Sequence, residues 1–188
     1  MSNRFIDELR QMLGNASVLT GADIDVRYYK DLAGRAAAKP RAVVRPRTAE
    51  QVSGLLRLCH REKIPVATQG GMTGLVCGAL PNTNEIVLSM ERMNAVEEVD
   101  ISAGVAIVQA GAPLQTLQER VEQEGYIFPL DLGSRGSCTI GGNISTNAGG
   151  NRVIRYHGAR PDTWYRSRYR GWHSPPWLAQ IPQEQHWD

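Results

Sequence analysis

The sequence C-T-I-G-G-N-I-S-T-N-A-G-G occupies residues 138–150 and decides how the rest of the chain is interpreted. It combines four glycines with two asparagines and three hydroxyl residues, and it carries no charge. Such a segment is poorly suited to filling a core or to forming a regular helix. Because glycine has no Cβ, the backbone N–H groups can approach a flat, oxygen-rich ligand closely. The stretch therefore predicts a ligand-contacting loop, with a flexible structural loop as the alternative.

Composition sets the broad class of the protein. The chain has 188 residues, 41% of them hydrophobic, and a net charge of +2. It contains no apolar run of membrane-spanning length, and its acid-containing N-terminus is not a secretory signal. Basic residues are scattered among acids, which does not favour a nucleic-acid partner. Three cysteines without metal-ligand spacing indicate reduced thiols and no metal site. We expect a globular cytoplasmic protein of one domain or two small lobes, without a transmembrane segment.

The first half of the chain predicts a strand–helix–strand unit. Residues 1–40 are expected to form an N-terminal arm with a short helix over residues 5–13. A strand begins at Ala42 and is stopped by Pro46. Thr48 begins T-A-E-Q, a capping box in which Gln51 reaches back to the N-cap amide. The apolar face of the next helix comprises Val52, Leu55, Leu56 and Cys59. A strand over residues 65–68 completes a βαβ unit with parallel strands.

A second glycine-rich loop, Q-G-G-M-T-G at residues 69–74, follows that strand directly. Ligands of α/β units lie beyond the carboxyl ends of the strands, where a glycine turn exposes backbone donors. The loop is neither G-x-G-x-x-G nor a P-loop, which argues against a standard NAD or P-loop nucleotide site. A purely structural turn remains the alternative.

The second half predicts further strands, at residues 86–89, 96–99 and 105–110. A helix with Pro113 in its first turn follows, buries Leu114, Leu117 and Val121, and ends near Gly125. Residues 127–132 then lead into residues 138–150. The two glycine-rich loops are expected to face one another across a cleft.

Several motifs together resemble a known family. P-R-A-V-V-R-P-R-T-A-E-Q-V, Q-G-G-M-T-G, L-S-M-E-R-M-N, V-Q-A-G and P-L-D-L-G-S-R-G-S-C-T-I-G-G-N-I-S-T-N-A-G-G occur in this order between residues 28 and 156. They resemble the PCMH-type FAD-binding domain of the FAD-linked oxidases, also called vanillyl-alcohol-oxidase-like flavoproteins. The D-L-G-S-R-G-S-C-T-I-G-G-N block is most similar to the D-2-hydroxyglutarate and D-lactate dehydrogenase branch. A domain like that of UDP-N-acetylmuramate reductase is the alternative, which fits this block less well.

The resemblance implies an α/β (α+β) fold of two lobes, a small βαβ lobe and a larger, mostly antiparallel one, with non-covalent FAD between them. It implies oxidation of a D-2-hydroxy acid, such as D-2-hydroxyglutarate, D-lactate or glycolate, by hydride transfer from C2 to flavin N5. The base and any metal ligands would lie in a C-terminal substrate domain that we expect to be absent. No catalytic residue is therefore assigned, and the electron acceptor stays unknown.

The resemblance also implies which residues contact FAD. Residues 69–74 would surround the pyrophosphate with backbone N–H groups, although relatives often carry Asn in place of Met72. Residues 129–134 and 138–150 would line the flavin and its ribityl chain, and Cys138 is expected to be a packing residue. The expected cofactor-binding residues are Gln69, Gly70, Gly71, Met72, Thr73, Gly74, Pro129, Gly133, Ser134, Cys138, Thr139, Gly141, Gly142, Asn143, Ser145, Thr146, Asn147, Gly149 and Gly150.

Residues 157–188 differ in character from the rest. All four tryptophans lie there, without helical or strand periodicity. Codon degeneracy allows a frame one base later, beginning within the His157 codon, to encode M-A-R-D-L, G-I-E-V-V, A-D-G-T-V-L and K-N-N-T-G, which are family motifs in order. We expect a frameshift after Tyr156 that leaves the FAD-binding domain at 41–156 incomplete and 157–188 non-native. A DNA sequence without these codons would exclude it.

One alternative to a flavin-binding domain and one alternative to a non-native tail stay open. The lost segment would have supplied a strand pair, so the second lobe would keep an unpaired edge that favours aggregation. The chain would then be an inactive truncated product with weak or no flavin binding. Residues 157–188 could instead form an aromatic and basic binding segment.

Overall fold

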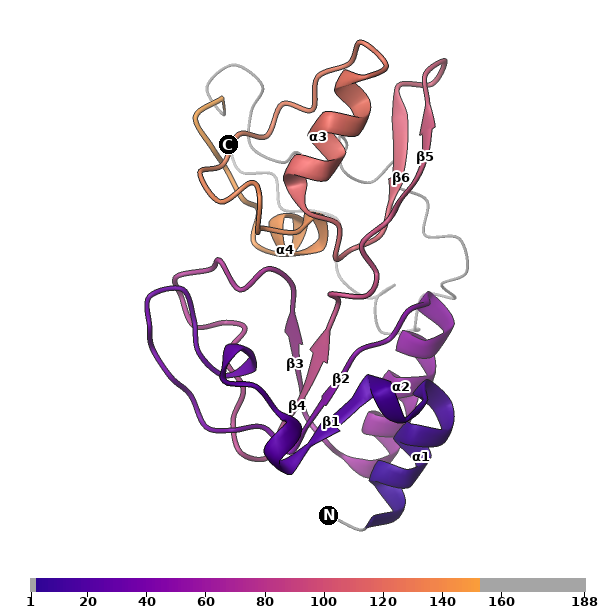
Figure 1. Cartoon of the computed structure of the whole chain (residues 1–188), viewed down its shortest axis with the longest axis vertical. Coiled ribbons are helices and arrows are strands. Elements are labelled where there is room, and N and C mark those ends of the chain that lie inside the picture. Colours follow the sequence, from indigo (N-terminus) through magenta and orange to yellow (C-terminus); the bar gives the residue numbers. More distant parts are fainter. Residues whose placement is uncertain (1–2, 153–188) are drawn as a thin grey trace, which may run out of the picture.

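The computed structural model describes residues 3–152, which form two lobes stacked along the long axis of the molecule (Figure 1). The lower lobe contains a four-stranded sheet and two long helices, and the upper lobe contains a strand pair and two shorter helices (Figure 1). The lower elements are α1 (Asn3–Leu13), β1 (Val18–Thr20), β2 (Ala42–Val44), α2 (Ala49–Glu62), β3 (Val66–Gln69) and β4 (Ile86–Ser89), with 3-10 turns at Asn15–Ser17, Gly21–Asp23 and Val26–Tyr28. The upper elements are β5 (Val96–Asp100), β6 (Val105–Val108), α3 (Leu114–Glu122) and α4 (Ile140–Ser145).

The lower sheet has the strand order β1-β2-β4-β3. β2 and β3 are parallel, as the βαβ pattern predicts, but β4 lies between them and pairs in parallel with both. The sequence of β4, I-V-L-S, is buried at every position, and a strand without an exposed face belongs at the centre of a sheet. β1 extends the sheet by pairing antiparallel with β2. The carboxyl ends of the three parallel strands therefore share one edge.

Both faces of this sheet are covered by residues from the predicted N-terminal arm. Alternate strand residues point to opposite faces, so Val44 and Leu88 pack with α1 and α2, while Val43 and Val87 pack with Ile24 and Tyr28. The α1 side chains in the first cluster are Phe5, Leu9 and Leu13, all buried. Residues 3–28 are thus an integral part of the lower lobe. The domain boundary predicted after residue 40 stays a prediction.

The ends of α2 and α3 differ in detail from the expected ones. Thr48 caps α2 by accepting a hydrogen bond from the Gln51 amide at 3.3 Å. The Gln51 side chain, however, accepts from the Arg47 amide at 2.7 Å rather than from the N-cap amide. Pro113 is the N-cap of α3 rather than a residue of its first turn, because its extended backbone places the helix start at Leu114. α3 buries its predicted apolar face, whereas α2 buries Val52, Leu55, Leu58 and Cys59 and leaves the predicted Leu56 only partly buried.

The upper lobe packs around α3. β5 and β6 pair antiparallel, with a register shift between Val96 and Glu98. Their inward side chains meet Leu114, Leu117 and Val121 of α3. The antiparallel pairing agrees with the expected character of this lobe.

The glycine-rich stretch itself corrects an expectation. Residues 138–150 contain the short helix α4, although their composition predicts no helix and little contribution to a core. Thr139 caps the helix, and Cys138 and Ile140 are buried in the upper core. A local cap and two buried apolar side chains thus outweigh the low helix propensity of Gly141 and Gly142.

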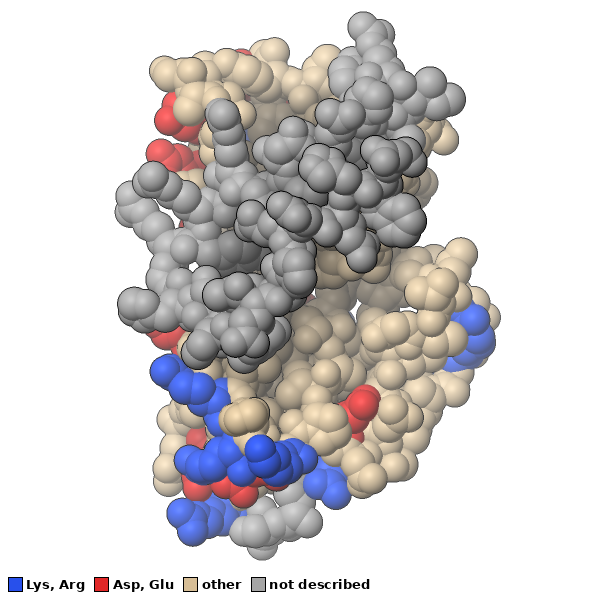
Figure 2. All heavy atoms as spheres, turned by 180° about the vertical axis from the view of Figure 1, so that it is seen from behind, with Lys and Arg blue, Asp and Glu red and all other residues tan. Residues whose placement is uncertain are grey.

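The surface behind the lower lobe mixes charges of both signs (Figure 2). Glu8 of α1 pairs with Arg4 and with Arg61 of α2, which links the two helices. Within residues 3–152, no helix is long and apolar enough to cross a bilayer, and no cluster of ligating side chains suits a metal ion. All three cysteines are free, and burial raises the pKa of the Cys59 thiol to about 11. The tail predicted at 157–188 lies outside the described residues and stays a prediction.

Candidate functional site

Gln69 anchors the first glycine-rich loop at the carboxyl end of β3. Its side chain is almost wholly buried, with 1% of the residue exposed. Nε2 donates hydrogen bonds to the carbonyl oxygens of Tyr28 and Ala79, both at 2.8 Å. Two acceptors at one nitrogen identify it as the amide NH₂, so Oε1 is the atom left without a partner in the described structure. Gln69 therefore fixes the start of the first glycine-rich loop against residues 28 and 79.

The loop that follows presents a run of backbone donors. Within residues 3–152, no protein group accepts a hydrogen bond from the N–H groups of Gly70, Gly71, Met72, Thr73 or Gly74. Met72 has φ +55, the left-handed conformation that turns the chain between these donors. Successive N–H groups in a turn carry partial positive charge and suit an anionic oxygen. The loop therefore has the chemistry of a phosphate or carboxylate site.

The two glycine-rich loops meet directly. A Cβ at Gly70 would lie 2.2 Å from Thr139 Oγ1, and a Cβ at Gly71 would lie 1.8 Å from the Ser137 carbonyl oxygen. α4 accordingly lies just beyond the carboxyl ends of β3 and β4 (Figure 1). The expectation that the loops face each other across a cleft is wrong at this point, because these glycines permit backbone contact. This contact joins the two lobes.

The second loop is held by its own hydrogen bonds. Ser145 Oγ donates to the Gly141 carbonyl at 2.7 Å, and Thr146 Oγ1 donates to the Gly142 carbonyl at 2.9 Å. The two hydroxyl protons are thus used within α4, and their oxygens remain available as acceptors. Asn143 is buried, with Nδ2 3.6 Å from Cys138 Sγ.

Other expected site glycines serve close packing. A Cβ at Gly141 would lie 2.8 Å from Ala110, and one at Gly150 would lie 1.8 Å from the Asp131 carbonyl oxygen. Ser134 accepts hydrogen bonds from the Ser137 and Cys138 amides at 2.8 Å through its carbonyl. By contrast, a Cβ at Gly74 or Gly133 would meet no heavy atom within 4 Å. The residues of the expected set that are exposed or half-buried are Gly70, Gly71, Met72, Thr73, Gly74, Pro129, Gly133, Ser134, Gly141, Gly142, Ser145, Thr146, Asn147, Gly149 and Gly150.

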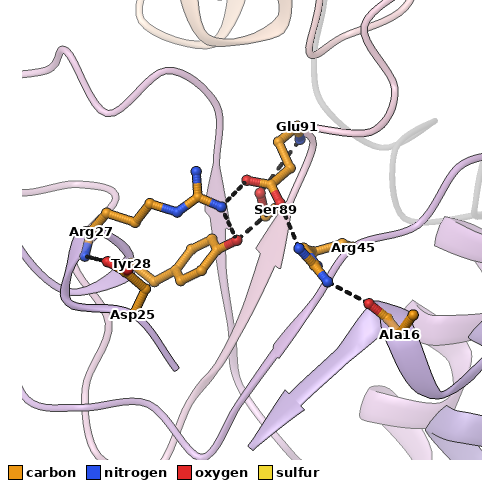
Figure 3. Close-up of polar contacts among 7 residues, drawn as sticks. All are labelled: Ala16, Asp25, Arg27, Tyr28, Arg45, Ser89 and Glu91. Carbon is orange, nitrogen blue, oxygen red and sulfur yellow. Dashed lines mark hydrogen bonds and ion pairs between the residues drawn. The ribbon is translucent and has the colours of Figure 1, made fainter. Parts of the chain in front are cut away.

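A polar network beside the first loop was not predicted. Glu91, which follows β4, accepts from Tyr28 Oη at 2.9 Å and from Arg45 Nη1 at 3.2 Å, and it pairs with Arg27 Nη2 at 3.0 Å (Figure 3). Burial and then the hydrogen bond to Glu91 raise the pKa of Tyr28, so its hydroxyl keeps the proton that it donates. Of these residues, Glu91 and Arg45 lie in motifs quoted above, L-S-M-E-R-M-N and P-R-A-V-V-R-P-R-T-A-E-Q-V. Tyr28 and Arg27 lie in the predicted arm.

We expect the Cys77→Gly substitution to stabilise the chain. Cys77 is exposed and has φ +63, a conformation that costs a residue with a Cβ about 1–2 kcal/mol. Glycine relieves that strain but gains entropy in the unfolded chain, so the free energy of unfolding should rise by about 0.5–1 kcal/mol. Urea unfolding checks this. Cys77→Ala removes the thiol and keeps the Cβ, so an equal gain from alanine would contradict the explanation.

Comparison with protein families matches residues 40–161 to the FAD binding domain. Among characterised proteins, the chain is 48% identical over 120 residues to the mitochondrial D-2-hydroxyglutarate dehydrogenase of Bos taurus, covering 64% of this chain and 22% of that protein. It is 48% identical over 118 residues to the mitochondrial enzyme of Danio rerio, covering 63% and 22%. It is 40% identical over 151 residues to the D-2-hydroxyglutarate dehydrogenase of Stutzerimonas stutzeri, covering 80% and 32%. The chain thus spans between a fifth and a third of these relatives.

Solved structures agree on the fold. Alkyldihydroxyacetonephosphate synthase superposes with a TM-score of 0.76 at 22% identity, covering 84% of this chain and 31% of that one. p-Cresol methylhydroxylase with bound substrate superposes with a TM-score of 0.63 at 25% identity, covering 78% and 29%.

These findings correct one expectation and establish the family. The cytoplasmic location inferred from the cysteines and the N-terminus is wrong, because the matched enzymes of Bos taurus, Danio rerio and Rattus norvegicus are mitochondrial. Reduced thiols are equally compatible with any reducing compartment, so cysteine usage could not distinguish the two. The resemblance to the FAD-linked oxidases is confirmed by the match over residues 40–161, and the chain belongs to the FAD binding domain family.

Proposed function

We propose that this chain is the FAD-binding part of a flavin-dependent D-2-hydroxy-acid dehydrogenase, with residues 70–74 at the FAD diphosphate. The observation that carries the proposal is the run of five backbone N–H groups without a protein acceptor among the described residues. Similarity to D-2-hydroxyglutarate dehydrogenases supports the substrate class. The residues that bind the hydroxy acid would lie in the rest of a much longer protein, such as these relatives are.

The residues present fit a dinucleotide with a negatively charged centre and a flat, polar end. The donors of the 70–74 loop suit the diphosphate oxygens, which bind well to successive amides. Residues 145–147 offer exposed hydroxyl and amide side chains within the second loop, where polar groups of a flavin and ribityl chain would find partners. Gly74 and Gly133 have open space where a Cβ would stand, so a ligand could approach their backbone.

The role of this chain in the reaction is to bind and orient. Bound FAD would supply the redox chemistry, as the acceptor of the hydride from C2 of the hydroxy acid. The contact between residues 70–71 and residues 137–139 keeps the two lobes in one arrangement, so both ends of the dinucleotide would meet a preformed surface. Gln69 and Thr139 fix the backbone on either side of that contact. Preformed donors bind more tightly, because less conformational freedom is lost on binding.

The direct test is flavin binding by the purified 188-residue chain. We expect a retained oxidised-flavin absorption spectrum, or its recovery after adding FAD and removing the excess. Titrations should show FAD and ADP binding more tightly than AMP and riboflavin, because only the first two present a diphosphate to residues 70–74. AMP and riboflavin are the matched controls, since each keeps one end of FAD without the diphosphate.

Two results would overturn the proposal. A chain that unfolds cooperatively but binds neither FAD nor ADP would be the inactive product considered above. Equal affinity for ADP and AMP would place the diphosphate elsewhere. The substrate class is tested separately in a full-length version, whose flavin absorbance should bleach anaerobically with D-2-hydroxyglutarate, D-lactate or glycolate. No bleaching by any of the three would exclude that class.

A further inference from the structure

Residues 25–37 contact the proposed diphosphate loop at both of its ends. This segment precedes the residues that match the FAD binding domain, 40–161. From it we propose a clamp: Tyr28 and Arg35 are positioning residues that hold residues 69–75 in the conformation that binds a diphosphate. The inference rests on the proposed function and extends it to residues outside the matched domain.

The first contact of the clamp is made by the Tyr28 carbonyl, which accepts a hydrogen bond from Gln69 Nε2 at 2.8 Å. Tyr28 is itself fixed, because its ring is buried and its hydroxyl donates to Glu91 at 2.9 Å (Figure 3). Arg27 donates to the same hydroxyl at 2.7 Å and lies over the ring, 4.6 Å from its centroid. The start of the loop is thus tied through Tyr28 to the carboxyl end of β4.

The second contact of the clamp is made by the Arg35 guanidinium. Arg35 Nη2 donates to the carbonyl oxygen of Leu75, the residue that follows the proposed diphosphate loop. Its Nε donates to Asp31 Oδ2 at 2.8 Å, and the Arg35 amide donates to Asp31 Oδ1 at 2.8 Å. Only 3% of the Asp31 side chain is exposed. Burial alone would raise the pKa of Asp31, but the hydrogen bonds from Arg35 lower it on balance, so the pair stays charged near neutral pH.

Arg35 is held by its own turn as well. The Asp31 amide donates to the Arg35 carbonyl at 2.9 Å, and the Ala37 amide donates to the Tyr29 carbonyl at 2.7 Å. Tyr28 and Arg35, which make the two contacts, therefore come from one hydrogen-bonded hairpin. Fixing the two ends of a short loop removes much of its conformational freedom before a ligand arrives. The donors of residues 70–74 then need less ordering when a diphosphate binds.

Arg35→Ala tests the clamp in the full chain. The dissociation constants of FAD and ADP should rise on the order of tenfold, because the end of the loop is released. In the ligand-free protein, limited proteolysis within residues 70–75 should accelerate, because a loop must be mobile to be cleaved. Arg35→Lys, which keeps a donor able to reach Leu75, should recover part of the affinity. A purely structural role would lower the urea midpoint without selectively increasing cleavage within this loop.

Two further variants complete the experiment. Arg41→Ala removes an exposed arginine that donates to Asn84 at the opposite edge of the sheet, and it should change neither affinity nor cleavage within the loop. Arg35→Ala leaves a buried carboxylate, so Asp31→Asn with Arg35→Ala removes that charge and should show the same losses in a folded chain. Unchanged cleavage and affinity in the double variant would overturn the clamp. A wild-type chain that binds neither FAD nor ADP would overturn the proposed function, and the clamp is then judged by the cleavage rate alone.

Discussion

Replacing Gly71 by alanine is expected to lower the free energy of unfolding by about 3 kcal/mol or more and to abolish FAD binding. The new Cβ would lie 1.8 Å from the Ser137 carbonyl oxygen and 3.0 Å from the Cys138 Cα. Both obstacles are backbone, so no side-chain rotation relieves the overlap. The loops must separate, which moves residues 70–74 away from the second loop. Urea unfolding and FAD titration measure the two effects.

Gly74→Ala is the matched control, because it makes the same change three residues later. No heavy atom lies within 4 Å of its Cβ position. Its free energy of unfolding should stay within about 0.5 kcal/mol of the wild type. Equal unfolding midpoints for the two alanine variants would contradict the direct contact between the loops.

Replacing Gln69 by leucine is expected to lower the free energy of unfolding by about 2–4 kcal/mol. Leucine fills a similar volume but removes both N–H donors, leaving the Tyr28 and Ala79 carbonyls without their partner. A buried polar group left unpaired costs about 1–3 kcal/mol. FAD affinity should fall as well, because the start of the 69–75 loop loses its tie to Tyr28. Denaturation and titration of the same sample separate the two losses.

Gln115→Leu serves as the control for this change. Gln115 is exposed on α3 and donates to Glu119 at 2.7 Å. Its replacement should alter the free energy of unfolding by no more than about 0.5 kcal/mol. A similar loss in both leucine variants would show that the Gln69 hydrogen bonds are not the cause.

Much of the local structure was predictable because its determinants are close in sequence. The apolar runs at residues 42–44 and 86–89, the Thr48 cap and the apolar face of α3 each depend on neighbouring residues, and each element formed as predicted. Strand order depends instead on which strand best tolerates burial on both faces. That comparison involves the whole sheet, so the insertion of β4 between β2 and β3 was missed.

The site was predictable in its chemistry and less so in its supports. Glycines in two loops indicated close backbone approach, and the structure shows that several of them approach protein backbone rather than open space. Arg35 and Tyr28 gave no signal, because an arginine and a tyrosine in an irregular segment are usually surface or core residues. Their hydrogen bonds to the loop join residues about forty positions apart in the sequence.

The sequence by itself determined the family, the cofactor class and most of the helices and strands. Those properties follow from motif order and from periodicities that short segments carry independently of their surroundings. Tertiary structure alone decided that residues 3–28 pack into the lower lobe, that the two glycine-rich loops touch, and that the 69–75 loop is held at both ends. Each of these depends on close contacts between segments distant in sequence, and no local pattern encodes such distances.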